Sequence, residues 1–372
     1  MPRTRTLILL ASAPAADYGH KVAIGESPRS DISELVRILG ADVLDFNDVA
    51  RSSEPLVRLA RQRGPYWGLA MLGVLRRREF ENIYVTGEDI GMPLAVLLHA
   101  ARAYGQVTVL IHHGGTPKRR LALRALGHNV WRNVICVSER QREVLVGPVG
   151  LPSQKVHQFN QGIDELFFRP PSGDSAANGY VFSCGRDSRD YPTLRKAAEG
   201  LSVPFRVVAS GWAAHAGFKQ AQNMEGASNI VVESGLSYRA LRDAYAGARF
   251  VVFPLDAVDY AAGVTGMCEA MAMGKAVIAS GSPGVADYMK DGVSGFVVPV
   301  GDTEALRSAI LLLWGDPALC ARMGRHNRKW AERRMTVTGY ATRIAGLFGV
   351  GTLASDDDPP GSTQASPADQ AE

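Results

Sequence analysis

One carboxylate and two glycines in the second half of this 372-residue chain are spaced to bind an anion and a neighbouring diol. Residues 250–255, FVVFPL, predict a strand, Gly263 and Gly266 mark a loop, and residues 267–273 predict a short helix. A glycine-bearing loop at a helix start offers free N–H groups and the positive end of the helix dipole. Glu269, expected in the first helical turn, can accept hydrogen bonds from a ribose. Alternatively, Glu269 only stabilises the helix end and the glycines only form a tight turn.

The elements that must position these residues follow a repeated pattern. Apolar, β-branched runs such as TLILLAS and KAVIASG alternate with helical stretches along both halves of the chain. Continuous apolar strands that end in glycine or a polar residue are typical of a parallel sheet covered on both faces. The length is long for one core and natural for two. We therefore predict two doubly wound α/β domains, with ligands at the carboxyl ends of the strands.

Composition excludes several classes of protein. A net charge of +4 is too small to indicate nucleic-acid binding, and four widely spaced cysteines predict buried free thiols in a reducing compartment rather than disulfides or metal ligands. The N-terminal stretch is similar to a signal peptide, but its apolar core is too short, so a buried strand is expected. No apolar run is long enough to span a membrane. Residues 351–372, which lack aromatics, predict disorder.

Residues 268–306 closely resemble the C-terminal signature of the family-4 retaining glycosyltransferases, also called glycosyl transferases group 1. In that family EAMA-GKPVI, G-PE and DG-TG-LVP-GD-EAL occur in this order, and here Asp287 stands where Glu is usual. The resemblance extends more loosely over residues 130–350, where QGIDELFFRP carries Gln161 in place of the family's Asn. Residues 1–105 add only the alternating pattern.

The resemblance implies a GT-B fold, with two Rossmann-like domains facing a central cleft. The expected division is an acceptor-binding domain over 1–166, a linker over 167–178 and a nucleotide-sugar-binding domain over 179–330. A C-terminal helix over 331–350 is expected to pack back on the first domain, before the tail.

The same resemblance assigns donor contacts. Glu269 would hold the ribose, and the backbone N–H groups of Val264, Thr265 and Gly266 would bind the diphosphate. The family's other glutamate lies eight residues earlier, where this chain has Ala261.

Further donor contacts come from three other segments. Asp259 is a hypothetical substitute for the missing acid. Arg186 and Arg189, after Gly185, would bind the diphosphate and stabilise its developing charge, since guanidinium suits phosphate oxygens; both arginines are otherwise surface charges. Leu236 would lie against the base, or belong to the core.

In the first domain, LIHHGG places His112 and His113 at the end of a strand, where the family often has a histidine that contacts the donor sugar. A histidine pair also suggests metal, but no third ligand has suitable spacing, so no metal site is expected. Glu88 and Asp89 follow a neighbouring strand and are candidate acceptor contacts or helix caps.

Basic residues cluster in the front half of the chain. They accompany Tyr66, Trp67 and an apolar run, which is typical either of a face on an anionic membrane or of a solvated face over a core helix. The basic residues are Arg58, Arg61, Arg63, Arg76, Arg77, Arg78, Lys118, Arg119, Arg120 and Arg124.

The sequence thus predicts a metal-independent, retaining glycosyltransferase without a cofactor beyond its nucleotide-diphosphate sugar donor. The acceptor would be a sugar, a lipid-linked compound or a small molecule, and the protein would be cytoplasmic with peripheral contact to the inner face of the membrane. Ala261 keeps open a nucleotide-sugar-binding protein without transfer activity, and a sugar-nucleotide epimerase is a further alternative. A dinucleotide-dependent oxidoreductase is disfavoured because no G-x-G-x-x-G follows the first strand.

Overall fold

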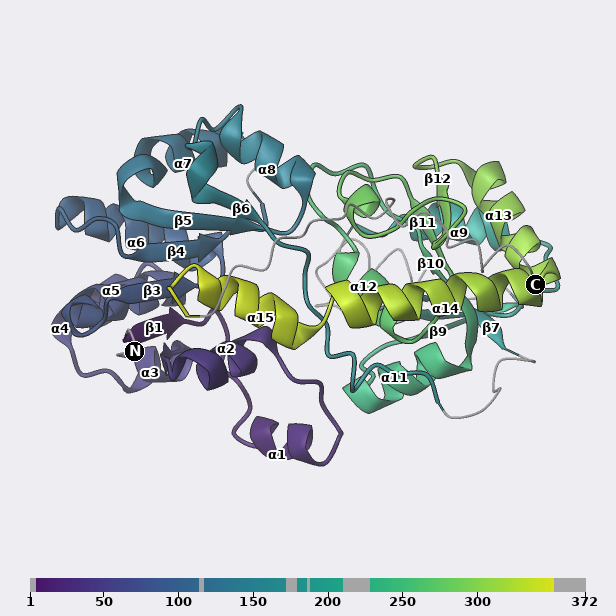
Figure 1. Ribbon diagram of the computed structural model, residues 1–372, viewed down its shortest axis with the longest axis horizontal. Helices are drawn as coiled ribbons and strands as arrows, with labels where there is room; N and C mark the ends of the chain where they lie inside the picture. Colours follow the sequence, from purple (N-terminus) through teal and green to yellow (C-terminus); the bar gives the residue numbers. More distant parts are fainter. Residues whose placement is uncertain (1–4, 114–116, 172–178, 186–187, 210–227, 351–372) are drawn as a thin grey trace. The chain divides into compact units, whose positions relative to one another are not determined.

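The chain folds into two compact units, each built on a parallel sheet (Figure 1). Among the described residues, the N-terminal unit contains residues 5–19, 30–159 and 338–350, and the C-terminal unit contains residues 20–29 and 160–337. The computed structural model describes residues 5–113, 117–171, 179–185, 188–209 and 228–350.

The N-terminal unit has a six-stranded sheet with the order β2-β1-β3-β4-β5-β6. All neighbours are parallel, and Leu7 lies beside Asp42 on one side and Ile83 on the other. Such strands need long crossover connections, which the helices provide. The strands are β1 (Thr6–Leu9), β2 (Asp42–Leu44), β3 (Asn82–Val85), β4 (Val107–Leu110), β5 (Trp131–Cys136) and β6 (Val156–Gln158).

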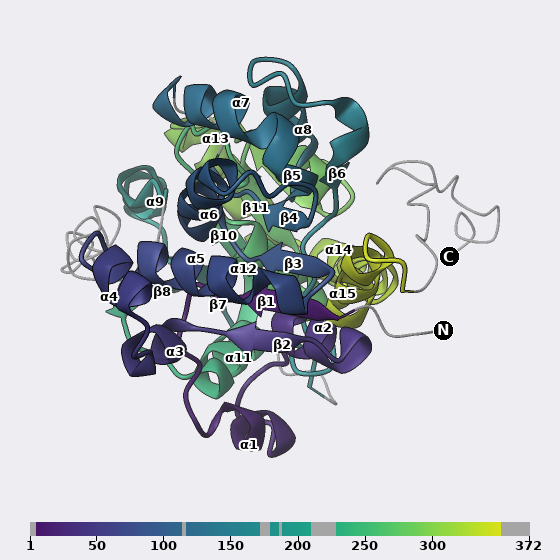
Figure 2. The ribbon, with the colours of Figure 1, turned by 90° about the vertical axis from the view of Figure 1, so that its left-hand side faces the viewer.

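Helices cover this sheet on both faces, as Figure 2 shows for the N-terminal unit. Four of them, α4 to α7, pack side by side in chain order. On the other face Tyr84 of β3 meets Phe348, with 6.4 Å between ring centroids. The helices are α2 (Asp31–Leu39), α3 (Phe46–Arg51), α4 (Pro55–Arg61), α5 (Pro65–Arg76), α6 (Glu88–Ala100), α7 (Pro117–Val130), α8 (Glu139–Val146) and α15 (Val337–Gly346), while α1 (Tyr18–Ala23) lies where the units divide.

The C-terminal unit repeats this plan with the order β12-β11-β10-β7-β8-β9. Its neighbouring strands are also parallel, with Val251 of β10 beside Phe182 of β7 and Val277 of β11. The strands are β7 (Tyr180–Cys184), β8 (Phe205–Val208), β9 (Ile230–Glu233), β10 (Ala248–Phe253), β11 (Val277–Ser280) and β12 (Gly295–Val298).

Side chains of β10 alternate between two cores, as the two-residue period of a strand requires. Val251 and Phe253 belong to the core beneath α11 and α12, whereas Phe250 and Val252 belong to the core beneath α9 and α13. The helices are α9 (Tyr191–Ala198), α11 (Tyr238–Gly247), α12 (Val264–Ala272), α13 (Thr303–Gly315) and α14 (Pro317–Arg334).

The predicted fold class is confirmed, and the N-terminal apolar run is the buried strand β1. The expected linker differs from the structure at its start, because Phe167 and Phe168 are buried in the core of the C-terminal unit. Residues 172–178 of that linker and the tail 351–372 lie outside the described residues.

The division between units also differs from the expected ranges. Residues 20–29 and 160–166 fall in the C-terminal unit, and the last helix joins the N-terminal unit from Thr338. All four cysteines are free and buried, as predicted. Among the described helices, none is long and apolar enough to cross a membrane.

Candidate functional site

The strand order of the C-terminal unit reverses between β7 and β10, which are neighbours at the centre of its sheet. At such a switch point the two following connections leave toward opposite faces, so a crevice opens at the carboxyl ends of the strands. The connection after β7 begins with Gly185, and the connection after β10 leads into α12. The two segments that the sequence suggested as donor contacts therefore lie together at the carboxyl ends of the central strands of this sheet.

Helix α12 begins at Val264, three residues earlier than expected. Gly263 caps it with φ 80°, a left-handed conformation that favours glycine. The N–H groups of Val264, Thr265 and Gly266 are the first three of the helix, where no carbonyl of the helix itself can accept from them. Glu269 consequently lies in the second turn, so the expectation of the first turn is wrong, and the helix has no acid in its first turn.

Close packing places this helix start against the end of β10. A Cβ on Gly266 would lie 2.7 Å from the ring of Phe253, so the close approach requires glycine. At Gly263 a Cβ would lie 3.4 Å from a terminal nitrogen of Arg189. The guanidinium of Arg189 and the positive end of α12 are therefore adjacent.

Arg189 is 5% exposed and is held in place by the strand ends. Its Nε donates to the carbonyl of Cys184 at 3.0 Å, and its guanidinium lies 5.6 Å from the centre of the Phe253 ring. A Cβ on Gly185, where φ is 146°, would collide with the same guanidinium. Arg189 thus is not a surface charge. A buried guanidinium beside a helix N-terminus favours an anion such as a diphosphate.

Glu269 is 7% exposed, and its Oε2 accepts a hydrogen bond from the hydroxyl of Tyr245 at 2.8 Å. That hydroxyl also lies 2.9 Å from the sulfur of Cys184. Burial raises the pKa of Tyr245 well above its ordinary value, and burial with the Glu269 charge raises the pKa of Cys184 to about 12. Both groups therefore stay protonated, and the phenol remains a donor to the carboxylate.

Leu236, Asp259 and Arg186 are further residues that were expected to contact the donor. Leu236 is partly buried and packs against the core that contains Tyr245. Asp259 is exposed, and Ala261 packs against the same core. Arg186 lies outside the described residues.

Gln161 and Tyr245 are polar neighbours of the site that were not among the expected contacts. The Nε2 of Gln161 donates to the hydroxyl of Thr265 at 2.9 Å, and its backbone N–H donates to the hydroxyl of Tyr288 at 2.9 Å. The only signal for Gln161 is its departure from the family's Asn. Tyr245 gives no signal, because in the sequence it reads as a core position of an amphipathic helix.

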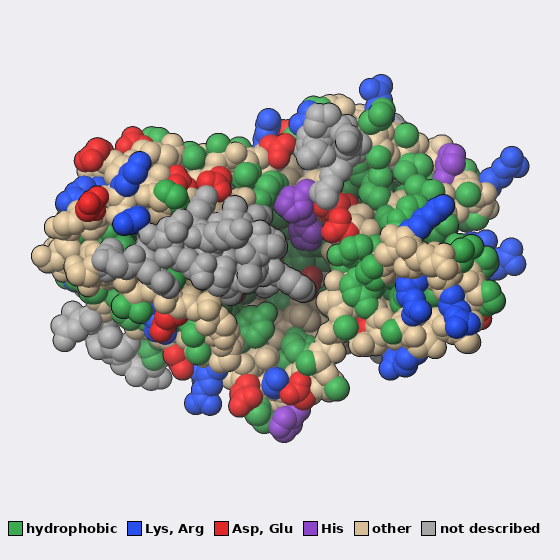
Figure 3. Space-filling model, turned by 180° about the vertical axis from the view of Figure 1, so that it is seen from behind, with side chains coloured by type: hydrophobic (Ala, Val, Ile, Leu, Met, Phe, Trp, Pro, Cys, Tyr) green, Lys and Arg blue, Asp and Glu red, His purple; other side chains and the backbone are tan. Residues whose placement is uncertain are grey.

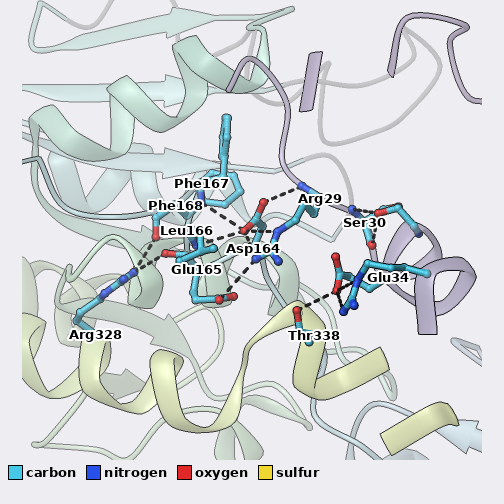
Figure 4. A network of polar contacts seen from close by, with 12 residues as sticks. Arg29, Ser30, Glu34, Asp164, Glu165, Leu166, Phe167, Phe168, Arg328 and Thr338 are labelled. Atoms are coloured by element: carbon cyan, nitrogen blue, oxygen red, sulfur yellow. Dashed lines mark hydrogen bonds and ion pairs between the residues drawn. The ribbon is translucent and has the colours of Figure 1, made fainter. Parts of the chain in front are cut away.

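Figure 4 shows how the segment that carries Gln161 is fixed within the C-terminal unit. Asp164 accepts hydrogen bonds from Arg29, at 2.7 Å from the backbone N–H and at 2.7 Å from Nη2. Arg328 of α14 donates to three carbonyls, including that of Ala272 at the end of α12. These contacts hold the segment against α12.

In the N-terminal unit, Glu88 fixes the loop after β4. This buried carboxylate accepts the backbone N–H groups of His112 and His113 at 3.0 and 3.1 Å, and Gln141 donates to the carbonyl of His112 at 2.6 Å. The His112 side chain is exposed, yet surrounding protein atoms lower its pKa by desolvation. The charge of Glu88, and to a smaller extent that of Asp31, raises the pKa of His112 and so counteracts part of that shift. Glu88 therefore positions the histidine loop, a role that the sequence analysis missed.

Among the described side chains, no three His, Cys, Asp or Glu residues gather closely enough to hold a metal ion.

Comparison with known proteins adds a family match and a fold match. Residues 189–316 match the family model described as Glycosyl transferases group 1. The chain is 24% identical over 275 residues to the O-antigen chain mannosyltransferase C of Escherichia coli, covering 69% of this chain and 72% of that protein. It is 26% identical over 285 residues to the GDP-mannose-dependent alpha-(1-6)-phosphatidylinositol monomannoside mannosyltransferase of Mycolicibacterium smegmatis, covering 69% and 74%.

Among solved structures, sucrose-phosphate synthase of Thermosynechococcus elongatus superposes with a TM-score of 0.72 at 15% identity, covering 93% of this chain and 98% of that one. Anabaena HepE in complex with UDP superposes with a TM-score of 0.71 at 18% identity, covering 93% and 99%. The fold is GT-B. The domain match and these neighbours support a GT-B glycosyltransferase.

Proposed function

We propose that this protein transfers a sugar from a nucleotide-diphosphate sugar to an acceptor hydroxyl with retention of anomeric configuration. The observation that carries the proposal is the placement of Arg189 beside the N-terminus of α12 at the switch point of the C-terminal sheet. This arrangement favours a diphosphate, and Glu269 lies one helical turn further on, within the same helix.

The chemistry that we propose divides between leaving-group stabilisation and acceptor positioning. Departure of the nucleotide diphosphate places negative charge on its oxygens, and Arg189 with the N–H groups of Val264 to Gly266 would stabilise that charge without a metal cation. Since these donors are fixed by the packing of Phe253 and Gly185, little reorganisation is needed as charge develops. Glu269 would accept from the ribose hydroxyls.

GDP-mannose is the donor that we propose to test first. Two of the relatives are named mannosyltransferases, one of them GDP-mannose-dependent. A structure of Anabaena HepE contains UDP-glucose. A thermal-shift panel of GDP-, UDP-, ADP- and TDP-sugars, followed by a transfer assay with the stabilising donor, tests the assignment, because a bound ligand stabilises the native state.

Retention and metal independence have separate tests. Nuclear magnetic resonance of the first product reports the anomeric configuration, and inverted product would refute retention. Turnover that disappears in a chelator and returns with Mg²⁺ would refute metal independence.

A binding protein without transfer activity is the second candidate, favoured by Ala261, which packs against the core where the resemblance expects a sugar-binding acid. It predicts donor binding by calorimetry with no turnover over sugar, lipid-linked and small-molecule acceptors. Release of nucleotide with any of these acceptors would exclude it.

A further inference from the structure

The helices α4 to α7 of the N-terminal unit carry charge of almost one sign. The sequence has no Asp or Glu over residues 55–78 or over residues 90–138, although each of these stretches contains six Lys or Arg residues. The acids on these four helices are Glu88 and Asp89 at the start of α6, and Glu88 is buried against the histidine loop. In Figure 3 blue side chains prevail over red ones on the part of the surface formed by the N-terminal unit.

Helix α4 adds exposed apolar side chains to this charge. Val57 and Ala60 face the core, whereas Leu56 and Leu59 are 51% and 62% exposed. Their neighbours Arg58, Arg61 and Arg63 are exposed too, and the Arg63 guanidinium lies 5.7 Å from the centre of the Trp67 ring. On α7, Leu121 is 70% exposed, and Arg124 is also exposed.

Exposed leucines among the arginines help to distinguish an anionic bilayer from a nucleic acid or an acidic protein segment as the partner. A nucleic acid or an acidic protein segment would neutralise the arginines but would leave a role only for scattered apolar contacts. The surface of an anionic bilayer can bind both kinds of side chain. Its headgroups bind the guanidinium groups, while leucine and tryptophan side chains enter the boundary with the acyl chains. Leu56, Leu59 and Trp67 lie within the basic stretch itself, which favours the bilayer.

We propose that the basic–apolar face, defined as residues 55–67 of α4 and the start of α5, docks the protein on an anionic lipid bilayer. The face lies wholly within the N-terminal unit. Binding through it requires neither a nucleotide sugar nor sugar transfer, so the inference stands or fails independently of the proposed function.

Flotation of the full chain with vesicles tests the proposal, in the absence of nucleotide sugar. The protein is expected to float with phosphatidylcholine vesicles that contain about one third phosphatidylglycerol, and much less with pure phosphatidylcholine or in about 0.5 M salt, which screens the arginines. The variant L56S/L59S is expected to lower the partition constant at least about tenfold. R58E/R61E should lower it by more than about 25-fold, since each arginine contributes about fivefold and each glutamate adds repulsion.

Matched controls come from exposed residues of the C-terminal unit. Leu311 and Leu312 of α13 are 45% and 51% exposed, so L311S/L312S changes apolar exposure by a similar amount and should leave partitioning unchanged. R322E/R325E on α14 is the corresponding charge control, because both arginines are exposed. All four variants alter exposed side chains and should keep the wild-type melting midpoint.

Three results would overturn the proposal. The wild type could fail to float with anionic vesicles. The α4 variants could lose no more partitioning than the controls. Finally, a single-stranded oligonucleotide could displace the protein from vesicles while L56S/L59S binds as the wild type does, which would assign the face to nucleic acid.

Discussion

Replacing Tyr245 with phenylalanine removes one oxygen from the buried contact that holds Glu269. The hydroxyl donates to Oε2 of Glu269 at 2.8 Å and lies 2.9 Å from the sulfur of Cys184, so the variant leaves both groups without this partner. A hydrogen bond to a charged group contributes about 1.5–3 kcal/mol to stability. We therefore expect a loss of about 2 kcal/mol, which lowers the melting midpoint by roughly 4–8 °C in a unit of this size.

The same variant should weaken nucleotide-sugar binding, because Tyr245 positions the carboxylate that we assign to the ribose. A ribose contact is equal in the ground state and the transition state, so KM for the donor should rise about tenfold while kcat changes little. The pKa of Tyr245 is raised well above its ordinary value, so the effect should not vary between about pH 6 and 9. Steady-state kinetics and calorimetry measure both effects.

The matched control is Tyr180→Phe, at the opposite end of β7. Its hydroxyl also donates a hydrogen bond, to the carbonyl of Ala244 at 2.8 Å, but it lies at the amino end of the strand rather than at the site. This control should lose stability without changing donor KM. A double-mutant cycle with Glu269→Gln should show non-additive effects. If Tyr245→Phe changes donor KM no more than Tyr180→Phe does, or if the cycle is additive, Tyr245 does not position Glu269.

Three further predictions concern stability and reactivity. Burial lowers the pKa of Lys275 to about 8, so between about pH 8 and 10.5 the unfolded state binds more protons than the native state. The free energy of unfolding of the wild type, measured by urea titration, should therefore rise by up to roughly 3 kcal/mol over that range relative to that of Lys275→Met. A difference in unfolding free energy that does not change with pH would contradict this. Asp164→Asn should cost about 2–3 kcal/mol in the same assay, because the buried carboxylate accepts three hydrogen bonds from the partly exposed Arg29, whereas an effect below about 0.5 kcal/mol would mean that the pair is incidental. The four cysteines should react with a thiol reagent at pH 8 only after denaturant is added, because all are buried and burial raises the pKa of Cys184, Cys268 and Cys320; a thiol that reacts in the native protein would refute this.

The sequence alone determined the two parallel sheets and placed the candidate site at the carboxyl ends of their strands. Strands such as FVVFPL are apolar on both sides, which only a sheet covered on both faces can bury, and their alternation with helices fixes the crossover plan. Glycine also indicates local backbone geometry, since Gly263 adopts a positive φ. Such requirements depend on neighbours in the chain or on the backbone, so a single sequence expresses them.

Only the tertiary structure decided which side chains meet. Tyr245 is 24 residues from Glu269, and Gln161 is 104 residues from Thr265, and no local pattern encodes either contact. Phe168 lies inside the segment predicted as a linker, and its burial likewise depends on a distant residue, Tyr245, whose ring centroid lies 6.2 Å away. Packing between distant segments also made Arg189 a buried cation beside α12, because its environment comes from β7, β10 and the helix start together.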